Sequence, residues 1–191
     1  MKTKSLLFLF VLLSLMTFSQ AKANPDDSAI KKSLTYFVNS IQSKHIDQAV
    51  SCIYPKYFTV VSKEQMTQIL NMTYNNQFMK IEVQDLKFGN IEKPELITGE
   101  YFSITQYFLK LKCNVSSLND EIKKKMTSAL TAKYGANNVK YLANEGSYLI
   151  NANMKACAVS KDKKVWKFVI LEKQYKKELL TVLPKKILDK F

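Results

Sequence analysis

The chain has 191 residues, a formal net charge of +13 and 47% hydrophobic residues, which fits one folded domain with a sizeable core and excludes a disordered chain. All 29 basic residues are lysine, and without arginine the chain lacks the planar group that usually grips phosphate at two points. We therefore expect a diffusely basic surface, no nucleic-acid partner and, with only four glycines and four prolines, no long flexible linker.

The N-terminal segment has the three parts of a secretory signal. Lys2 and Lys4 give a positive start, residues 6–18 form an apolar run, and small residues at 21 and 23 precede a cleavage site after Ala23. The apolar run is too short to span a membrane, which takes roughly 17–25 apolar residues, and no cysteine follows it to carry a lipid anchor. We predict that residues 1–23 are a signal peptide and that the mature chain is secreted or periplasmic.

Helical periodicity comes first in the mature chain. Asp27 or Ser28 is suited to cap a first helix, and a second, short helix is expected over 45–53. Ser62 and Gln65 have the spacing of a capping box, which predicts the start of a third helix. We expect the stripe of this third helix to be buried: Met66, Ile69, Leu70 and Thr73.

From residue 80 the pattern changes to alternation with period two, which indicates a sheet with one buried side. We expect strands over 80–92, 99–115, 147–159 and 165–171, with a bulge at Gly89 in the first of them. Helices followed by a meander of antiparallel strands are typical of the α+β class.

Two further segments have helical character. A helix is expected over 119–134, where Gly135 is suited to end it. The segment 173–191 is amphipathic and rich in lysine, and we interpret it as a helical tail that docks on a single domain formed by 24–172. Attachment to a membrane surface through the basic face is the alternative, which we do not favour.

Three segments in this order resemble parts of a known fold. SAIKKSLTYFVNSIQSKHIDQAVSCIYP reads as a long helix, a turn and a second helix; VSKEQMTQIL reads as a third helix; and in KKVWKFVILEK an aromatic residue follows a turn and a lysine at the start of a strand. Together they resemble the nuclear-transport-factor-2-like superfamily, also called SnoaL-like or ketosteroid-isomerase-like, and small exported bacterial proteins with this layout.

The resemblance covers roughly residues 28–172. It implies a cone, in which the N-terminal helices pack in the concave face of a strongly curved antiparallel sheet. The helix over 119–134 and the tail depart from the minimal family pattern.

A cone of this kind implies a cavity, and our first hypothesis is an exported, non-catalytic binding or interaction module. Its cavity would hold a small apolar or glycan-like ligand, or only its own side chains. Trp166 leaves two interpretations open, because it can seal the core between sheet and first helix or form an aromatic wall for a ligand. The candidate cavity residues are Tyr57, Phe58, Tyr107, Tyr148 and Trp166.

The second hypothesis is an enzyme, because the resemblance includes isomerases and dehydratases that use an acid inside the cone. The candidate acids are Glu82, Asp85 and Glu100. None lies in a diagnostic context, so we assign no catalytic residue. His45 is the sole histidine and has no partner at the spacing of a metal site, so we expect it on the surface and assign no metal and no cofactor.

The third hypothesis is a homodimer that forms through the exposed face of the sheet. The alternation predicts which side chains point to that face: Lys110, Lys112, Asn151, Asn153 and Lys155.

The alternation also bears on the cysteines. Cys113 falls on the apolar face of its strand and Cys157 on the more polar face of its own. A disulfide requires Cβ atoms roughly 3.5–4.5 Å apart, which opposite faces forbid, so we predict that these two are unlinked. The pairing of Cys52 stays open.

Overall fold

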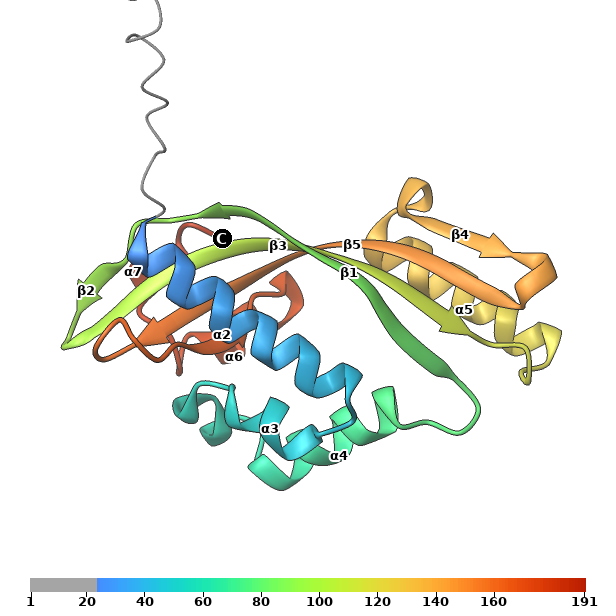
Figure 1. The fold of residues 1–191 in the computed structure, drawn as a ribbon, viewed down its shortest axis with the longest axis horizontal. Coiled ribbons are helices and arrows are strands. Elements are labelled where there is room, and N and C mark those ends of the chain that lie inside the picture. The colour runs from blue at the N-terminus through green and yellow to red at the C-terminus, as the bar shows by residue number, and fades with distance from the viewer. Residues whose placement is uncertain (1–23) are drawn as a thin grey trace, which may run out of the picture.

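The computed structural model describes residues 24–191, and the predicted signal peptide lies outside the described residues. Figure 1 shows a long antiparallel sheet with helices packed against it. The helices are α2 (Pro25–Gln42), α3 (Ile46–Ser51), α4 (Lys63–Tyr74), α5 (Asp120–Tyr134), α6 (Lys176–Leu179) and α7 (Lys185–Leu188), and a 3₁₀ turn, η1 (Pro55–Thr59), joins α3 to α4. The strands are β1 (Lys80–Ile91), β2 (Glu95–Ile97), β3 (Glu100–Asn114), β4 (Val139–Leu142), β5 (Ser147–Ser160) and β6 (Lys167–Ile170).

The sheet has six strands in the order β1-β3-β5-β4, with β2 paired to β3 and β6 paired to β5. All of these pairings are antiparallel, so the predicted α+β class is confirmed. The predicted strong curvature into a cone is not confirmed, because the sheet is twisted but neither closes nor curls strongly (Figure 1). Period-two alternation fixes which side of a strand is buried, but it carries no information about curvature.

Boundaries of the elements agree closely with the sequence pattern. Ser62 and Gln65 form the predicted capping box of α4, and the pairing of β1 with β3 shifts register between Phe88 and Ile91, at the predicted bulge. The first helix begins earlier than expected, because the side chain of Asn24 caps it. Proline at the first helical position loses no hydrogen bond there, so the helix starts directly after this cap.

Helix α2 covers one end of one sheet face, which we call the helix face. Ile30 and Leu34 of α2 pack there in one core cluster with Trp166 and Phe168. Trp166 is 1% exposed, and its ring nitrogen donates a hydrogen bond to the carbonyl of Lys163 over 3.0 Å. This confirms the interpretation that Trp166 seals the core between the sheet and the first helix.

Helix α5 covers the far end of the same face (Figure 1). Its Met126 and Leu130 pack against the cluster that includes Tyr148 and Ile150 of β5. The hydroxyl of Tyr148 donates to the carbonyl of Lys123 over 2.8 Å, so this tyrosine is fixed beneath the helix. The predicted stop of α5 is confirmed, since Gly135 ends it with a φ of 88°, and the side chain of Asn119 caps its start.

A tight turn leads into β5. Gly146 has a φ of +56°, a conformation that L side chains rarely adopt, and a Cβ at this position would lie 2.9 Å from the Cβ of Ser116. Only glycine fits this turn without strain.

The C-terminal tail covers part of the opposite face, which we call the tail face. Instead of one amphipathic helix it forms two single-turn helices, α6 and α7, because Pro184 interrupts the chain and caps the second. Their apolar residues pack against Phe102 and Ile104 of β3, and Cys157 and Val159 of β5. Those from the tail are Leu179, Val182, Leu183, Ile187 and Leu188.

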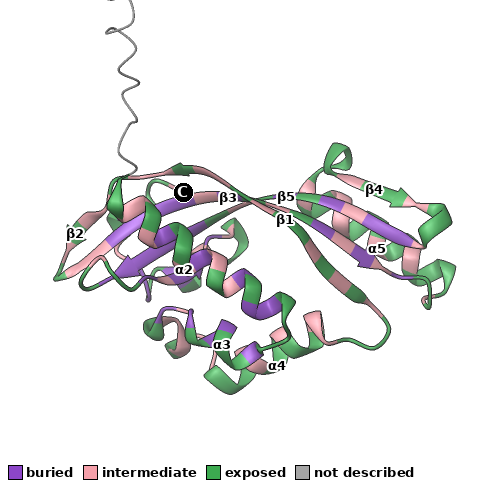
Figure 2. Ribbon diagram, viewed as in Figure 1, coloured by how far each residue is buried: buried purple, intermediate pink, exposed green. Residues whose placement is uncertain are grey.

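Because the tail docks there, one end of β3 and β5 is buried on both faces, as Figure 2 shows. Cys157 lies on the face opposite Cys113, as expected, but it is 0% exposed because the tail covers it. The prediction that Cys113 and Cys157 are unlinked is confirmed, and all three cysteines of the chain, Cys52 included, are free.

Candidate functional site

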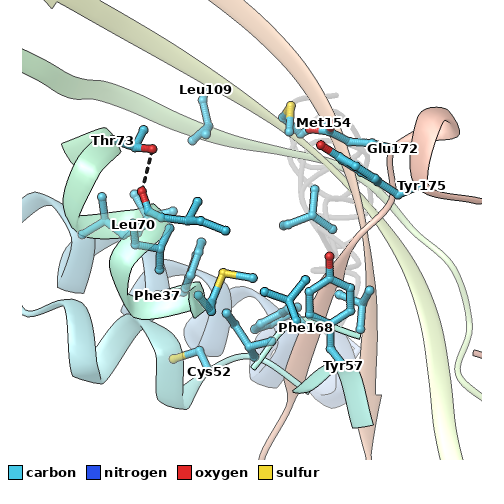
Figure 3. Close-up of a pocket in the computed structure, with 18 of the residues that line it drawn as sticks. Phe37, Cys52, Tyr57, Leu70, Thr73, Leu109, Met154, Phe168, Glu172 and Tyr175 are labelled. Atoms are coloured by element: carbon cyan, nitrogen blue, oxygen red, sulfur yellow. Dashed lines mark hydrogen bonds between the residues drawn. The ribbon is translucent and has the colours of Figure 1, made fainter. Parts of the chain in front are cut away.

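Helix α4 does not pack tightly onto the sheet, and a pocket lies beneath it. None of its residues is fully buried, so the expectation of a buried stripe was wrong. Instead, the four residues of that stripe line a cavity of about 550 Å³. Figure 3 shows Leu70 and Thr73 of this helix on one side of the open space and Leu109 and Met154 of the sheet above it.

The walls of the pocket are predominantly apolar. Helix α2, the segment from α3 to η1, helix α4 and the helix face of the sheet all contribute to them, and its size falls in the range of roughly 300–1,000 Å³ that is typical of small-ligand sites. Apart from the residues of α4, the apolar lining residues are Phe37, Val38, Ile41, Cys52, Ile53, Val60, Val61, Val83, Leu109, Met154, Phe168, Val169 and Ile170.

One side of the pocket is polar, where the end of α5 meets the chain that follows β6. Lys133 and Glu172 form an ion pair there with an N–O distance of 3.0 Å. The second carboxylate oxygen of Glu172 accepts a hydrogen bond from Gln174 over 2.9 Å, so both of its oxygens are engaged. Besides this pair, Glu178 is the one charged residue that lines the pocket within residues 24–191.

Five tyrosines also line the pocket: Tyr57, Tyr74, Tyr107, Tyr134 and Tyr175. Their hydroxyls take part in none of the hydrogen bonds among the described residues, although Tyr54 and Tyr148 outside the pocket are both hydrogen-bonded through theirs. Burial raises the pKa of Tyr57, Tyr74 and Tyr107. These phenols therefore keep their protons at neutral pH and are available as donors.

The pocket contains two of the five predicted cavity residues. Tyr57 and Tyr107 line it, whereas Phe58, Tyr148 and Trp166 do not. Phe58 is half-buried on η1, Tyr148 is fixed under α5, and Trp166 is enclosed beneath α2. In the last two cases the aromatic ring fills a core, which leaves no open space beside it.

The sequence did not reveal the polar side of the pocket. Lys133 and Glu172 are 39 positions apart in the chain, and Lys133 lies in the helix that departs from the pattern of the resembled family. The one signal in the sequence that could have indicated the pocket is the weak apolar stripe of α4. Its Thr73 and the adjacent Tyr74 are unusual for a helix face that packs in a dry core.

The acids proposed for catalysis lie outside the pocket. Glu82 and Asp85 are exposed and form ion pairs with the neighbouring Lys80 and Lys87. Glu100 accepts a hydrogen bond from the Tyr54 hydroxyl over 2.7 Å. Burial opposes ionisation of Glu100, but hydrogen bonds from Tyr54 and Lys56 outweigh it and lower its pKa, so it is an ionised structural partner.

Neither a metal site nor a membrane-spanning helix is found among residues 24–191. His45 is exposed at the start of α3, as expected, and makes no capping hydrogen bond. No three His, Cys, Asp or Glu side chains of the described part of the chain gather to hold an ion. No helix of that part is long and apolar enough to cross a bilayer.

No family model matches this sequence, and no curated protein matches it. The function is therefore inferred from the geometry of the pocket.

Proposed function

We propose that the chain is an exported binding module whose pocket holds a small, largely apolar ligand. The observation that carries this proposal is the cavity of about 550 Å³ between α4 and the helix face of the sheet. Protein interiors are close-packed, and unfilled space between two apolar surfaces forfeits dispersion contacts. A cavity of this size is costly for stability alone, and an apolar ligand would restore the missing contacts.

The proposal is tested by filling the cavity and measuring the binding of a neutral apolar dye, Nile red. Leu109 lies on β3 at the pocket, and Leu109→Trp places a larger side chain in the open space. The matched control is Leu96→Trp, since Leu96 is also on a strand but is 61% exposed and does not line the pocket. We expect Leu109→Trp to weaken dye binding at least tenfold and the control to leave it unchanged. Equal binding by both variants would refute the proposal.

The position of the helices supports a distant relation to the cone fold, which we propose without its strong curvature. Helices α2, α3 and α4 lie on one face of the sheet with a cavity beneath them, as the resemblance implies. A measured structure that places α2 or α4 on the tail face would contradict this relation.

Export is the second part of the proposal. It rests on the charged start, apolar run and small residues of the sequence before Asn24. N-terminal sequencing of the protein purified from its native host should give Asn24 as the first residue, and the protein should be found outside the cytoplasm. A cytoplasmic protein that begins with Met1 would contradict export.

The enzyme alternative has less support from the geometry. An isomerase of the ketosteroid type needs a carboxylate base deep in an apolar cavity, whereas the acids that line this pocket, Glu172 and Glu178, lie on its polar side. Glu172 is also bound by Lys133 and Gln174. Turnover of a ketone or hydroxy substrate that is lost in Glu172→Gln would restore this alternative.

The dimer alternative is also less favoured. The predicted residues lie on the part of the tail face that the tail leaves open, and Lys110 and Lys155 are exposed there. A second copy docked on this surface would bring lysine toward lysine, and like charges that approach closely repel each other. We expect the mass measured by light scattering at high protein concentration to be that of a monomer.

A further inference from the structure

We propose that the pocket selects an uncharged amphiphile: an apolar chain or ring system that ends in a hydroxyl or carbonyl group. The inference rests on the proposed function and deepens it by naming the class of ligand. Two independent features of the polar side carry it, namely how its charges are paired and how its tyrosine hydroxyls are left without partners.

The first feature is the pairing of charge. The chain has 29 lysines and a net charge of +13, so attraction of an anion would be the simple expectation. Of the lysines within residues 24–191, only Lys133 lines the pocket, and it is paired with Glu172 at 3.0 Å. It also lies over the ring of Tyr134, with 5.5 Å between the ammonium nitrogen and the ring centroid.

This pairing disfavours an anionic head group. A carboxylate that enters the pocket loses hydration and finds Lys133 with its charge already compensated by Glu172. The remaining charged residue, Glu178, is negative and offers an anion no compensating charge. A cationic head group gains little in its place, because Glu178 is exposed and screened by solvent, and Glu172 is neutralised by Lys133.

The second feature is the set of five tyrosine hydroxyls. Figure 3 shows those of Tyr57 and Tyr175 pointing toward the open centre of the pocket. Burial first, and then the nearby Tyr175, Glu172 and Glu178, raise the pKa of Tyr57, which therefore stays protonated. A protonated phenol both donates and accepts a hydrogen bond, which suits a neutral hydroxyl or carbonyl oxygen.

A donor without a partner in the protein bonds to water or to a ligand, and none of these hydroxyls is sealed away from the pocket. Tyr107 is the strongest case, because it is 2% exposed overall and lines the cavity. A neutral oxygen that replaces water beside these phenols restores their hydrogen bonds, and it brings no charge into the apolar space. The apolar body of the ligand then fills the remainder of the pocket against α2, α4 and the sheet.

The test compares three ligands with the same apolar chain: dodecan-1-ol, dodecanoate and dodecylammonium at pH 7.5. Each ligand competes with Nile red for binding to the protein of residues 24–191. We expect the alcohol to bind at least tenfold more tightly than either ion. Tighter binding of dodecanoate or dodecylammonium, or equal binding of all three, would overturn the inference while leaving the pocket as a binding site. Failure of Nile red and all three ligands to bind would refute the proposed function itself.

Variants of the tyrosines provide the second arm. Tyr57→Phe and Tyr175→Phe remove one hydroxyl each and keep the ring, and we expect each to weaken dodecanol about three- to tenfold while changing the binding of the two ions by less than twofold. The matched control is Tyr36→Phe, since Tyr36 is on α2, 49% exposed and outside the pocket. A variant that weakened all three ligands alike would show a purely structural role and contradict the assignment.

Discussion

The packing of α2 on the sheet makes a quantitative prediction for Leu34→Ala. Leu34 is 0% exposed and belongs to the cluster that contains Trp166. The substitution removes three carbon atoms from the core, which corresponds to about 2.5 kcal/mol of transfer free energy at ~0.8 kcal/mol per carbon. The residual cavity adds to this, so we expect the free energy of unfolding to fall by about 3–4 kcal/mol.

The assay is unfolding in urea followed by tryptophan fluorescence. Trp166 is the only tryptophan of the chain and lies in the perturbed cluster, so its exposure to water reports directly on loss of this core. With a slope of about 2 kcal/mol per molar urea, the midpoint should fall by about 1.5–2 M. The control is Leu180→Ala, where the side chain is 55% exposed and the expected loss is below about 0.5 kcal/mol.

Two results would refute the reasoning. One is a shift for Leu34→Ala that is no larger than that of Leu180→Ala, which would mean that α2 does not bury Leu34. The other is an unfolding midpoint that does not shift, together with a native-state emission maximum typical of a water-exposed tryptophan. This result would mean that the ring of Trp166 is not enclosed.

Three further predictions concern charge, thiols and a turn. Hydrogen bonds from Lys186 and Lys190 lower the pKa of Glu95 to about 2. Because the folded-state pKa lies below the usual value, the stability that Glu95 contributes is present above about pH 4.5 and is lost as the pH falls toward 2. Glu95→Gln should therefore reduce the loss of stability that is measured between these pH values. Burial raises the pKa of all three thiols, that of Cys157 to about 12. We therefore expect them to react with Ellman's reagent only after unfolding in denaturant without reductant, and fewer than three reactive thiols would contradict the free cysteines. Gly146→Ala combines a φ of +56° with a clash and should lower stability by about 1–3 kcal/mol in thermal unfolding, whereas no change would show that the turn differs.

Much of the fold could be predicted because the signals are local. The capping box of α4 and the cap of α5 are set by side chains within three positions of each other. The alternation in β3 and β5 assigns their helix face correctly, and one short bulge near Gly89 follows from a single residue.

What could not be predicted depends on non-local packing. The alternation marks Asn151, Asn153 and Lys155 as exposed, which is correct, and continues to Cys157, which is buried only because the tail docks there. An amphipathic pattern shows that a tail has an apolar side, but it does not show which surface that side covers.

The pocket was only half predictable for the same reason. The resemblance to the cone fold implied a cavity, and its candidate residues included Tyr57 and Tyr107. The sequence could not separate aromatic rings that line a space from rings that fill one. Whether Tyr148 lines a cavity depends on the position of α5, and no residue near Tyr148 in the sequence encodes that position. The ion pair of Lys133 with Glu172 likewise exists only after α5 and the end of β6 have come together.

The docking of the tail has a consequence for how the protein is made. Ile187 and Leu188 complete the layer that covers one end of β3 and β5, and both strands precede these residues in the chain. This end of the two strands therefore stays uncovered on the tail face until the tail has been synthesised. We propose that this protein is exported, and a layer completed by the tail would delay closure of the structure until that segment has docked.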